Sequence, residues 1–223
     1  MTVEEYLRRR DEAQDKAWPT VPLLPGIERL VQHLKKHDIP MAVATGSRKR
    51  NYILKTKGAQ VQSIFRYFDL EKNVVTGDPL PEDPEVPGRV ANGQRGIRKG
   101  RGKPHPDIFL VAAKECLGRE VGDVSAEVSA DLAEGLVAER RKGLVFEDAI
   151  PGVIAGKRAG MNGGRFSSDL GKSSRLYVIF LVVWVAVPEL RALESGADVA
   201  ADQIIQSLEE FRPEEWGLPP YDS

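Results

Sequence analysis

Three short segments of the sequence carry polar groups of the kinds that bind phosphate. Thr45-Gly46-Ser47 follows an apolar run and offers two hydroxyls together with backbone N–H groups, which suit the oxygens of a phosphate. Lys103 offers an ammonium group as a point charge. Glu147-Asp148 offers two carboxylates, whose oxygens suit Mg²⁺. A site that united the three segments would hold a phosphate through hydroxyl, amide and ammonium groups beside a metal ion.

Each segment taken alone also has an ordinary structural interpretation. A Ser or Thr after a strand is more often part of a turn or a helix cap, and a Glu-Asp pair at a strand end more often caps the next helix. A single lysine is usually a solvated surface residue. The order of the segments and their context at strand ends favour a shared site, because parallel sheets bind ligands at the carboxyl ends of their strands.

The elements that must position these groups alternate between apolar strands and helices. Strands are predicted over 39–44, 74–76 and 143–146, and the apolar run 176–187 also indicates a buried strand. Helices are predicted over 2–17, 48–57 and 201–211, and further helices begin near residues 26, 106 and 151. This alternation predicts an α/β fold, a Rossmann-like parallel sheet with helices on both faces.

Proline, glycine and charge mark the boundaries along the chain. Residues 1–22 contain one helix, with a capping box formed by Thr2 and Glu5, and a proline-rich linker; residues 23–223 form the main domain. Within that domain, 79–102 is a long loop rich in Pro, Gly and charge, and 162–181 is a Gly/Ser-rich insertion. A loop of this length inside a compact domain is either functional or disordered.

Composition excludes several classes of protein. The formal net charge is −1, so no broad attraction to nucleic acid or to an anionic membrane is expected. The longest apolar run is about a dozen residues, short of the roughly 20 that a membrane helix needs. Cys116 is the only cysteine, and the N-terminus has no signal-peptide pattern. We therefore expect a cytoplasmic protein without nucleic-acid or membrane partners.

The order of the three segments resembles that of the haloacid dehalogenase (HAD)-like hydrolase superfamily. MAVATGS (41–47) is similar to its second motif, GKPHPDIF (102–109) to its third, and GLVFEDAIPGVIAGKRAGM (143–161) to its fourth. The fourth motif is typical of the beta-phosphoglucomutase-like branch. Within that branch, the sequence resembles fungal proteins similar to pseudouridine-5′-phosphatase and glycerol-3-phosphatase.

The resemblance implies roles for these residues. Thr45, with Gly46 and Ser47, would bind the transferring phosphoryl group, and Lys103, before a cis Pro104, would neutralise its charge. Asp148 would coordinate Mg²⁺, with Glu147 as direct or water-mediated support. In this family an aspartate accepts the phosphoryl group before water hydrolyses the acyl phosphate, so Thr45, Lys103 and Asp148 would assist catalysis.

The sequence departs from the family at the first motif. That motif, an Asp-x-Asp-Gly-Thr pattern on the first strand, supplies the nucleophile, and the pattern does not occur in these 223 residues. In the family the first strand is central, between the strands of the second and fourth motifs. We therefore expect only a remnant of the helical cap at 1–22 and a sheet with two unpaired inner edges, unless the extra apolar residues of the insertion fill the central position.

The implied function is a Mg²⁺-dependent phosphatase of a small phosphorylated metabolite, a nucleotide or sugar phosphate, with no turnover expected from the chain as written. Other readings stay open: a catalytically inactive phosphate- and Mg²⁺-binding regulatory protein, a purely structural protein, or a truncated gene-model fragment without independent function. His33 and His37 are spaced as a possible metal-binding pair, but lysine neighbours favour a solvated helix face. The 216–221 end is expected to pack as a C-terminal anchor.

Overall fold

The computed structural model describes most of the chain. The described residues are 1–79, 96–147, 149–161, 201–203, 205 and 207–222, together with the backbone of 177–180. Asp148, most of the predicted loop 79–102 and most of the predicted insertion 162–181 lie outside the described residues.

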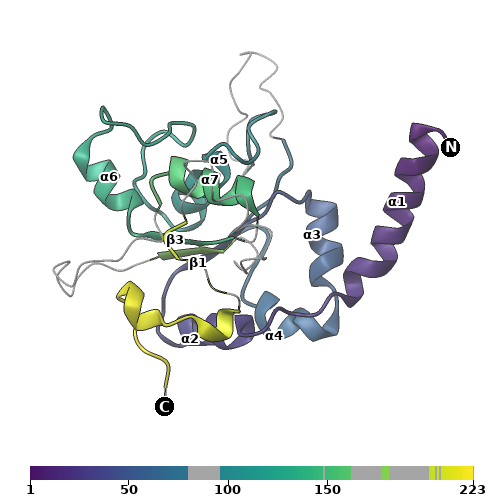
Figure 1. The fold of residues 1–223 in the computed structure, drawn as a ribbon, viewed down its shortest axis with the longest axis horizontal. Helices are drawn as coiled ribbons and strands as arrows, with labels where there is room; N and C mark the ends of the chain where they lie inside the picture. Colours follow the sequence, from purple (N-terminus) through teal and green to yellow (C-terminus); the bar gives the residue numbers. More distant parts are fainter. Residues whose placement is uncertain are drawn as a thin grey trace.

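A parallel sheet of four strands forms the centre of the molecule (Figure 1). The strands are β1 (Met41–Ala44), β2 (Val74–Val75), β3 (Gly143–Phe146) and β4 (Tyr177–Phe180), in the order β2-β1-β4-β3. Every neighbouring pair is parallel, as the pairings of Val43 with Val74 and of Leu144 with Val178 show. The predicted α/β class with a parallel sheet is confirmed.

Strand β4 occupies the inner position of the sheet, between β1 and β3. Met41 pairs with Val178 on one side of it, and Phe146 pairs with Phe180 on the other. The expectation of two unpaired inner edges is therefore wrong. The physical reason is that an apolar, β-branched and aromatic segment can bury its backbone N–H and C=O groups only by pairing them, and the centre of a sheet pairs both of its edges. The apolar residues at the end of the insertion fill the central position, the alternative that the sequence left open.

Helices cover both faces of the sheet (Figure 1). The helical elements in chain order are α1 (Val3–Ala17), η1 (Trp18–Thr20), α2 (Ile27–Lys36), α3 (Lys49–Thr56), η2 (Ala59–Val61), α4 (Gln62–Phe65), α5 (Asp107–Val111), the π-helical turn η3 (Ala112–Cys116), α6 (Glu134–Arg140), α7 (Ile150–Arg158), η4 (Leu208–Glu210) and η5 (Pro213–Trp216).

Alternation along the strands divides the core into two layers. Val43 and Leu144 point into a cluster with α2, α4 and the C-terminal segment. Ala42 and Ala44 point into the opposite cluster with α5, η3 and α7. Successive strand residues face opposite sides of a sheet, so a strand buried on both faces needs an almost continuous apolar run, as β1 has. The layers explain why the strand segments carry so few polar residues.

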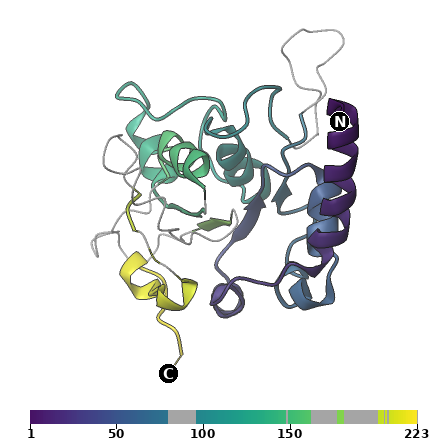
Figure 2. The same ribbon diagram turned by 45° about the vertical axis from the view of Figure 1, so that its right-hand side comes forward.

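Helix α1 stands apart from this core. Thr2 Oγ1 accepts the N–H of Glu5 at 3.1 Å, so half of the predicted capping box is present. The helix buries none of its residues. It extends past α3 (Figure 2), and Asp15 near its end pairs with Arg50 of α3. No helix in the described part of the chain is long and apolar enough to cross a membrane.

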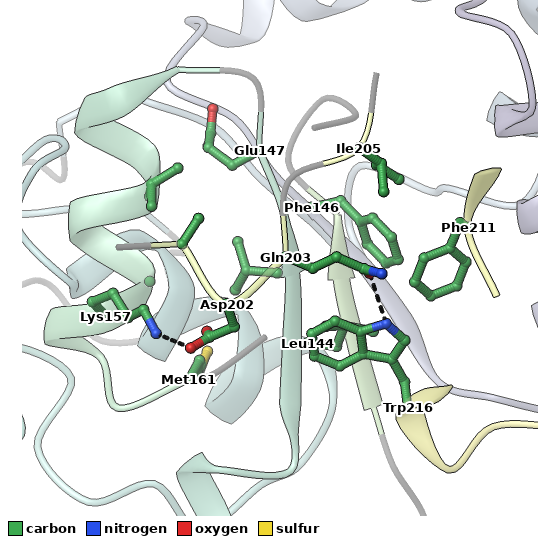
Figure 3. A pocket seen from close by; sticks show the side chains of 14 residues that line it. Leu144, Phe146, Glu147, Lys157, Met161, Asp202, Gln203, Ile205, Phe211 and Trp216 are labelled. Carbon is green, nitrogen blue, oxygen red and sulfur yellow. Dashed lines mark hydrogen bonds and ion pairs between the residues drawn. The ribbon is translucent and has the colours of Figure 1, made fainter. Parts of the chain in front are cut away.

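The C-terminal segment packs as an anchor, as expected, but without the helix predicted over 201–211. Among the described residues of 201–211, only Leu208–Glu210 form a helical element, a short 3₁₀ turn. Phe211 contacts Phe146 edge-to-face at 5.0 Å, and Trp216 Nε1 donates to Gln203 Oε1 at 3.0 Å (Figure 3). The apolar side chains of this segment pack on the sheet from an extended backbone. Tertiary packing therefore overrides the helical spacing of the sequence.

The structure contradicts the prediction that His33 lies on a solvated helix face. Its side chain is buried, and Nε2 lies 2.8 Å from the carbonyl oxygen of Pro219. Tyr221 packs 4.7 Å from the His33 ring. The C-terminal segment covers this face of α2, a contact that the local sequence of the helix does not reveal.

Candidate functional site

The loop Thr45-Gly46-Ser47 lies directly after β1, at the carboxyl edge of the sheet. Thr45 is buried, and its backbone N–H donates to the carbonyl of Val75 at 2.9 Å. The N–H of Ser47 donates to Thr45 Oγ1 at 3.1 Å. The Thr45 side chain thus closes a local turn, the ordinary structural role of such a residue. A hydroxyl that accepts one hydrogen bond still carries a proton to donate, so this role is compatible with phosphate binding.

A second loop, Thr76-Gly77-Asp78, holds the first one in place. The N–H of Gly77 donates to the carbonyl of Ser47 at 2.9 Å. Asp78 Oδ2 accepts the N–H of Lys49 at 2.5 Å and the hydroxyl of Thr76 at 2.7 Å, so Asp78 caps the start of α3. This loop was not predicted from the sequence. Its signal was present, because a Thr-Gly-polar triplet follows β2 as another follows β1.

Gly77 is required by a close approach of two backbones. A Cβ at Gly77 would lie 2.3 Å from the carbonyl oxygen of Gly46. At Gly46 the opposite holds, since a Cβ there would meet nothing within 4 Å. The space beside Gly46 is therefore open on the side where its side chain would project.

Lys55, another residue missed in the sequence, brings an ammonium group to the same loop. Its Nζ donates to Ser47 Oγ at 3.0 Å and lies 5.0 Å from the centre of the Trp18 ring. No local pattern distinguishes Lys55 from the other basic residues of α3. Only the packing of the linker at Trp18 over α3 shows its position.

Lys103 lies against Glu147. Its Nζ is 2.8 Å from Glu147 Oε2, and the two side chains are 14% and 3% exposed. The Lys103–Pro104 bond is cis, as the resemblance implied. Lys103 comes from the loop before α5 and Glu147 from the end of β3, so two segments that the sequence predicted to share a site are in contact.

The start of α7 leaves space for the Glu147 carboxyl group. A Cβ at Gly152 would lie 2.0 Å from Glu147 Cδ, so a larger residue there would require the Glu147 carboxyl group to move. The N–H of Ala149 donates to Glu147 Oε1 at 3.3 Å. Figure 3 shows the carboxyl group pointing away from Phe211 and Trp216, past the end of β3. Buried carboxylates need such hydrogen-bonded partners to remain ionised.

A second ion pair fixes the loop that carries Lys103. Arg101 Nε and Nη2 each donate to Asp107 at 2.7 Å, and Nη2 also donates to the carbonyl of Ser125 at 2.8 Å. The hydrogen bond with Asp107 raises the pKa of Arg101 above its ordinary value. Asp107 is buried in the first turn of α5. The two-pronged pair holds the turn between Arg101 and α5, and with it Lys103.

The described residues at this edge do not by themselves fit Mg²⁺. Of the described carboxylates that follow strands there, Glu147 already accepts from Lys103 and Ala149 through its two oxygens, and Asp78 Oδ2 accepts from Lys49 and Thr76. Within the described ranges no three His, Cys, Asp or Glu side chains are grouped as metal ligands. Asp148, the predicted ligand, lies outside them.

The two parts of the site lie at the same edge of the sheet. Thr45 follows β1 and Glu147 follows β3, and both strands flank β4 in a parallel sheet. Two strand spacings separate them by about 10 Å. The structure thus brings the Thr45 loop and the Lys103–Glu147 pair to one edge, where hydroxyl, amide and ammonium groups could act on the same anion.

Comparison with known proteins shows the family of the chain. Residues 2–160 match the family model described as haloacid dehalogenase-like hydrolase. The chain is 37% identical over 222 residues to (DL)-glycerol-3-phosphatase 2 of Arabidopsis thaliana, covering 100% of this chain and 67% of that protein. It is 34% identical over 221 residues to mitochondrial (DL)-glycerol-3-phosphatase 1 of the same plant, covering 99% and 54%.

A yeast protein is also similar. A probable pseudouridine-5′-phosphatase of Saccharomyces cerevisiae is 29% identical over 221 residues, covering 98% of this chain and 71% of that protein. The chain thus spans between about half and about seven tenths of the length of these relatives. The family match covers most of the described structure and the loops after β1 and β3. The chain belongs to the haloacid dehalogenase-like hydrolase family.

Proposed function

We propose that this chain binds the phosphate group of a small phosphomonoester at the carboxyl edge of its sheet. The observation that carries the proposal is the placement of the Lys103–Glu147 pair at the same edge as the Thr45-Gly46-Ser47 loop. The names of the relatives support a phosphorylated metabolite as ligand, since they specify glycerol-3-phosphate and pseudouridine 5′-phosphate as substrates.

Each group has a distinct part in holding the anion. The Thr45 hydroxyl donates a hydrogen bond to a phosphate oxygen. The open space beside Gly46 lets the phosphate approach the backbone closely, as glycine-containing loops at helix starts commonly allow. Lys103 contributes positive charge from a largely buried position, where it is screened less than at the surface.

We further propose that these 223 residues hold the phosphate without hydrolysing it. Family chemistry needs an aspartate nucleophile, and the Asp-x-Asp-Gly-Thr pattern that supplies it does not occur in this sequence. Hydrogen bonds and charge alone can stabilise a phosphoryl group, but they do not form the acyl phosphate. Mg²⁺ binding by Asp148 and a cytoplasmic location belong to the same proposal, as predictions from the sequence.

Titration calorimetry with inorganic phosphate, with and without Mg²⁺, tests the binding. We expect saturable binding that weakens at least about tenfold in Thr45→Ala and in Lys103→Met, the loss of one charge-assisted hydrogen bond. Lys114→Met, a change of the same kind on an exposed residue, is the control and should bind normally. Equal phosphate affinity in all four proteins would overturn the proposal. Hydrolysis of p-nitrophenyl phosphate that Asp148→Ala abolishes would overturn the expected lack of turnover.

A further inference from the structure

A large cavity opens beside the Thr45-Gly46-Ser47 loop. Its volume is about 460 Å³, and its wall comes from the linker after η1 and from α2, β1, α3 and α4. Protein interiors are normally packed with few voids larger than a water molecule, whereas binding sites for small molecules measure some 300–1,000 Å³. The cavity therefore has the size of a ligand site.

The wall of this cavity is mainly apolar. Ile27 and Val31 of α2 contribute to one side, and Ile64, Phe65 and Phe68 to another. Such a lining favours apolar or aromatic groups, because burial of apolar area drives their transfer from water. A purely polar organic group such as glycerol would lose its hydrogen bonds to water there without replacement.

Tyr52 of α3 adds an aromatic side chain to the wall. The residue is 6% exposed, and its hydroxyl lies in the protein interior without a hydrogen-bond partner among the described residues. Burial raises the pKa of this hydroxyl far above its ordinary value, so it remains neutral at every physiological pH. Because the hydroxyl is enclosed, the ring is the part of Tyr52 that borders the cavity, which adds to its apolar character.

The cavity also reaches the Thr45-Gly46-Ser47 loop, which is the phosphate loop of the proposed function. Thr45 and Ser47 line it together with Lys55, whose Nζ donates to Ser47 Oγ at 3.0 Å. A phosphate held at Thr45 would thus have its ester oxygen beside an opening lined by apolar side chains. The polar and apolar parts of the cavity match the two halves of a phosphomonoester.

We infer that this cavity takes the organic part of the phosphomonoester, and that this part is apolar or aromatic. The inference rests on the proposed function, because the phosphate loop orients the ester. It names a substrate class that differs in polarity from glycerol phosphate.

Calorimetry with three probes tests the inference: inorganic phosphate, glycerol 3-phosphate and phenyl phosphate. We expect phenyl phosphate to bind at least about tenfold tighter than glycerol 3-phosphate, because its ring is buried against the apolar wall.

Filling the cavity gives an independent test. Val31→Phe and Ile64→Phe each place an aromatic ring in the cavity, and thermal unfolding identifies which of the two folds normally. A folded variant should keep its affinity for phosphate and lose the aryl preference; Val128→Phe, on a residue 38% exposed, should keep both. Binding of inorganic phosphate without a preference for the aryl ester over glycerol 3-phosphate would overturn this inference and leave the proposed function standing. Failure of inorganic phosphate to bind would overturn the proposed function as well.

Discussion

The ammonium of Lys103 lies 2.8 Å from the carboxylate of Glu147, and both groups are largely removed from solvent. The pair links the loop before α5 to the end of β3, two segments 44 residues apart. Glu147 thereby positions the Lys103 ammonium group, which we propose binds the phosphate. Breaking such a pair leaves one charge buried without its partner, which usually costs more than the intact pair contributes.

Glu147→Gln should therefore destabilise the fold by about 3 kcal/mol, because the Lys103 charge loses its ionised partner in a buried position. Urea unfolding followed by circular dichroism measures the change. Asp222→Asn is the matched control: its partner Lys36 is 61% exposed, and an exposed pair contributes less than about 1 kcal/mol. Equal losses of unfolding free energy in the two variants would contradict the burial of the Lys103–Glu147 pair.

Arg140 is expected to be essential for folding. The residue is fully buried, and its guanidinium donates to the carbonyls of Val121 and Ala126 at 2.8 Å and of Asp123 at 3.0 Å. Arg140→Met would leave the buried carbonyl of Val121 and the partly buried carbonyls of Ala126 and Asp123 without this donor, and it should cost about 3 to 5 kcal/mol or prevent folding. Arg141→Met, a change of the same type on the exposed neighbour, should alter the free energy of unfolding by less than about 0.5 kcal/mol. Urea unfolding of both proteins checks the difference.

Asp123 should contribute to the acid sensitivity of the fold. The backbone N–H and the hydroxyl of Ser125 both donate to Asp123 Oδ1 at 2.8 Å, and these bonds hold the pKa of Asp123 below its ordinary value of 3.8. A carboxyl group with a lowered folded-state pKa stabilises the fold above its unfolded-state pKa and loses that effect as the pH falls through the folded-state value.

Asp123→Asn should accordingly lower the midpoint of urea unfolding at pH 7. The difference in midpoint between the variant and the unchanged protein should become smaller below pH 3.8. The comparison needs urea unfolding at pH 7 and at the lowest pH at which the protein stays folded. A gap that stays constant across this range would show that the carboxylate charge has no part in stability.

Gly46 and Gly77 should respond in opposite ways to the same change. Gly77→Ala forces a methyl group to within 2.3 Å of the Gly46 carbonyl, and it should destabilise the protein by at least about 1 kcal/mol and displace the phosphate loop. Gly46→Ala meets no atom within 4 Å, so stability should change little while phosphate affinity falls. Thermal unfolding measures the loss of stability in Gly77→Ala, and calorimetry with phosphate measures the loss of affinity in Gly46→Ala. A stable Gly77→Ala protein that binds phosphate normally would contradict the close contact of the two loops.

Local patterns in the sequence predicted the elements that carry the site. The apolar runs at β1, β2 and β3 and the polar residues after them placed Thr45 and Glu147 at strand ends, and the sheet confirms these positions. The predicted helix over 201–211 is wrong, because its apolar residues pack on β3 from extended chain and a 3₁₀ turn. Spacing alone cannot distinguish a helix from a segment whose conformation is set by the surface beneath it.

The sequence by itself thus determined the fold class, the strand ends and the kinds of group present at them, because hydrophobic periodicity and turn residues act over a few neighbouring positions. Only the tertiary structure decided that β4 lies between β1 and β3, that Glu147 pairs with Lys103, and that Lys55 and Tyr52 border one cavity. Such contacts join residues far apart in the chain. Their selection depends on the total surface that the packed chain buries, and no short stretch of residues contains that information.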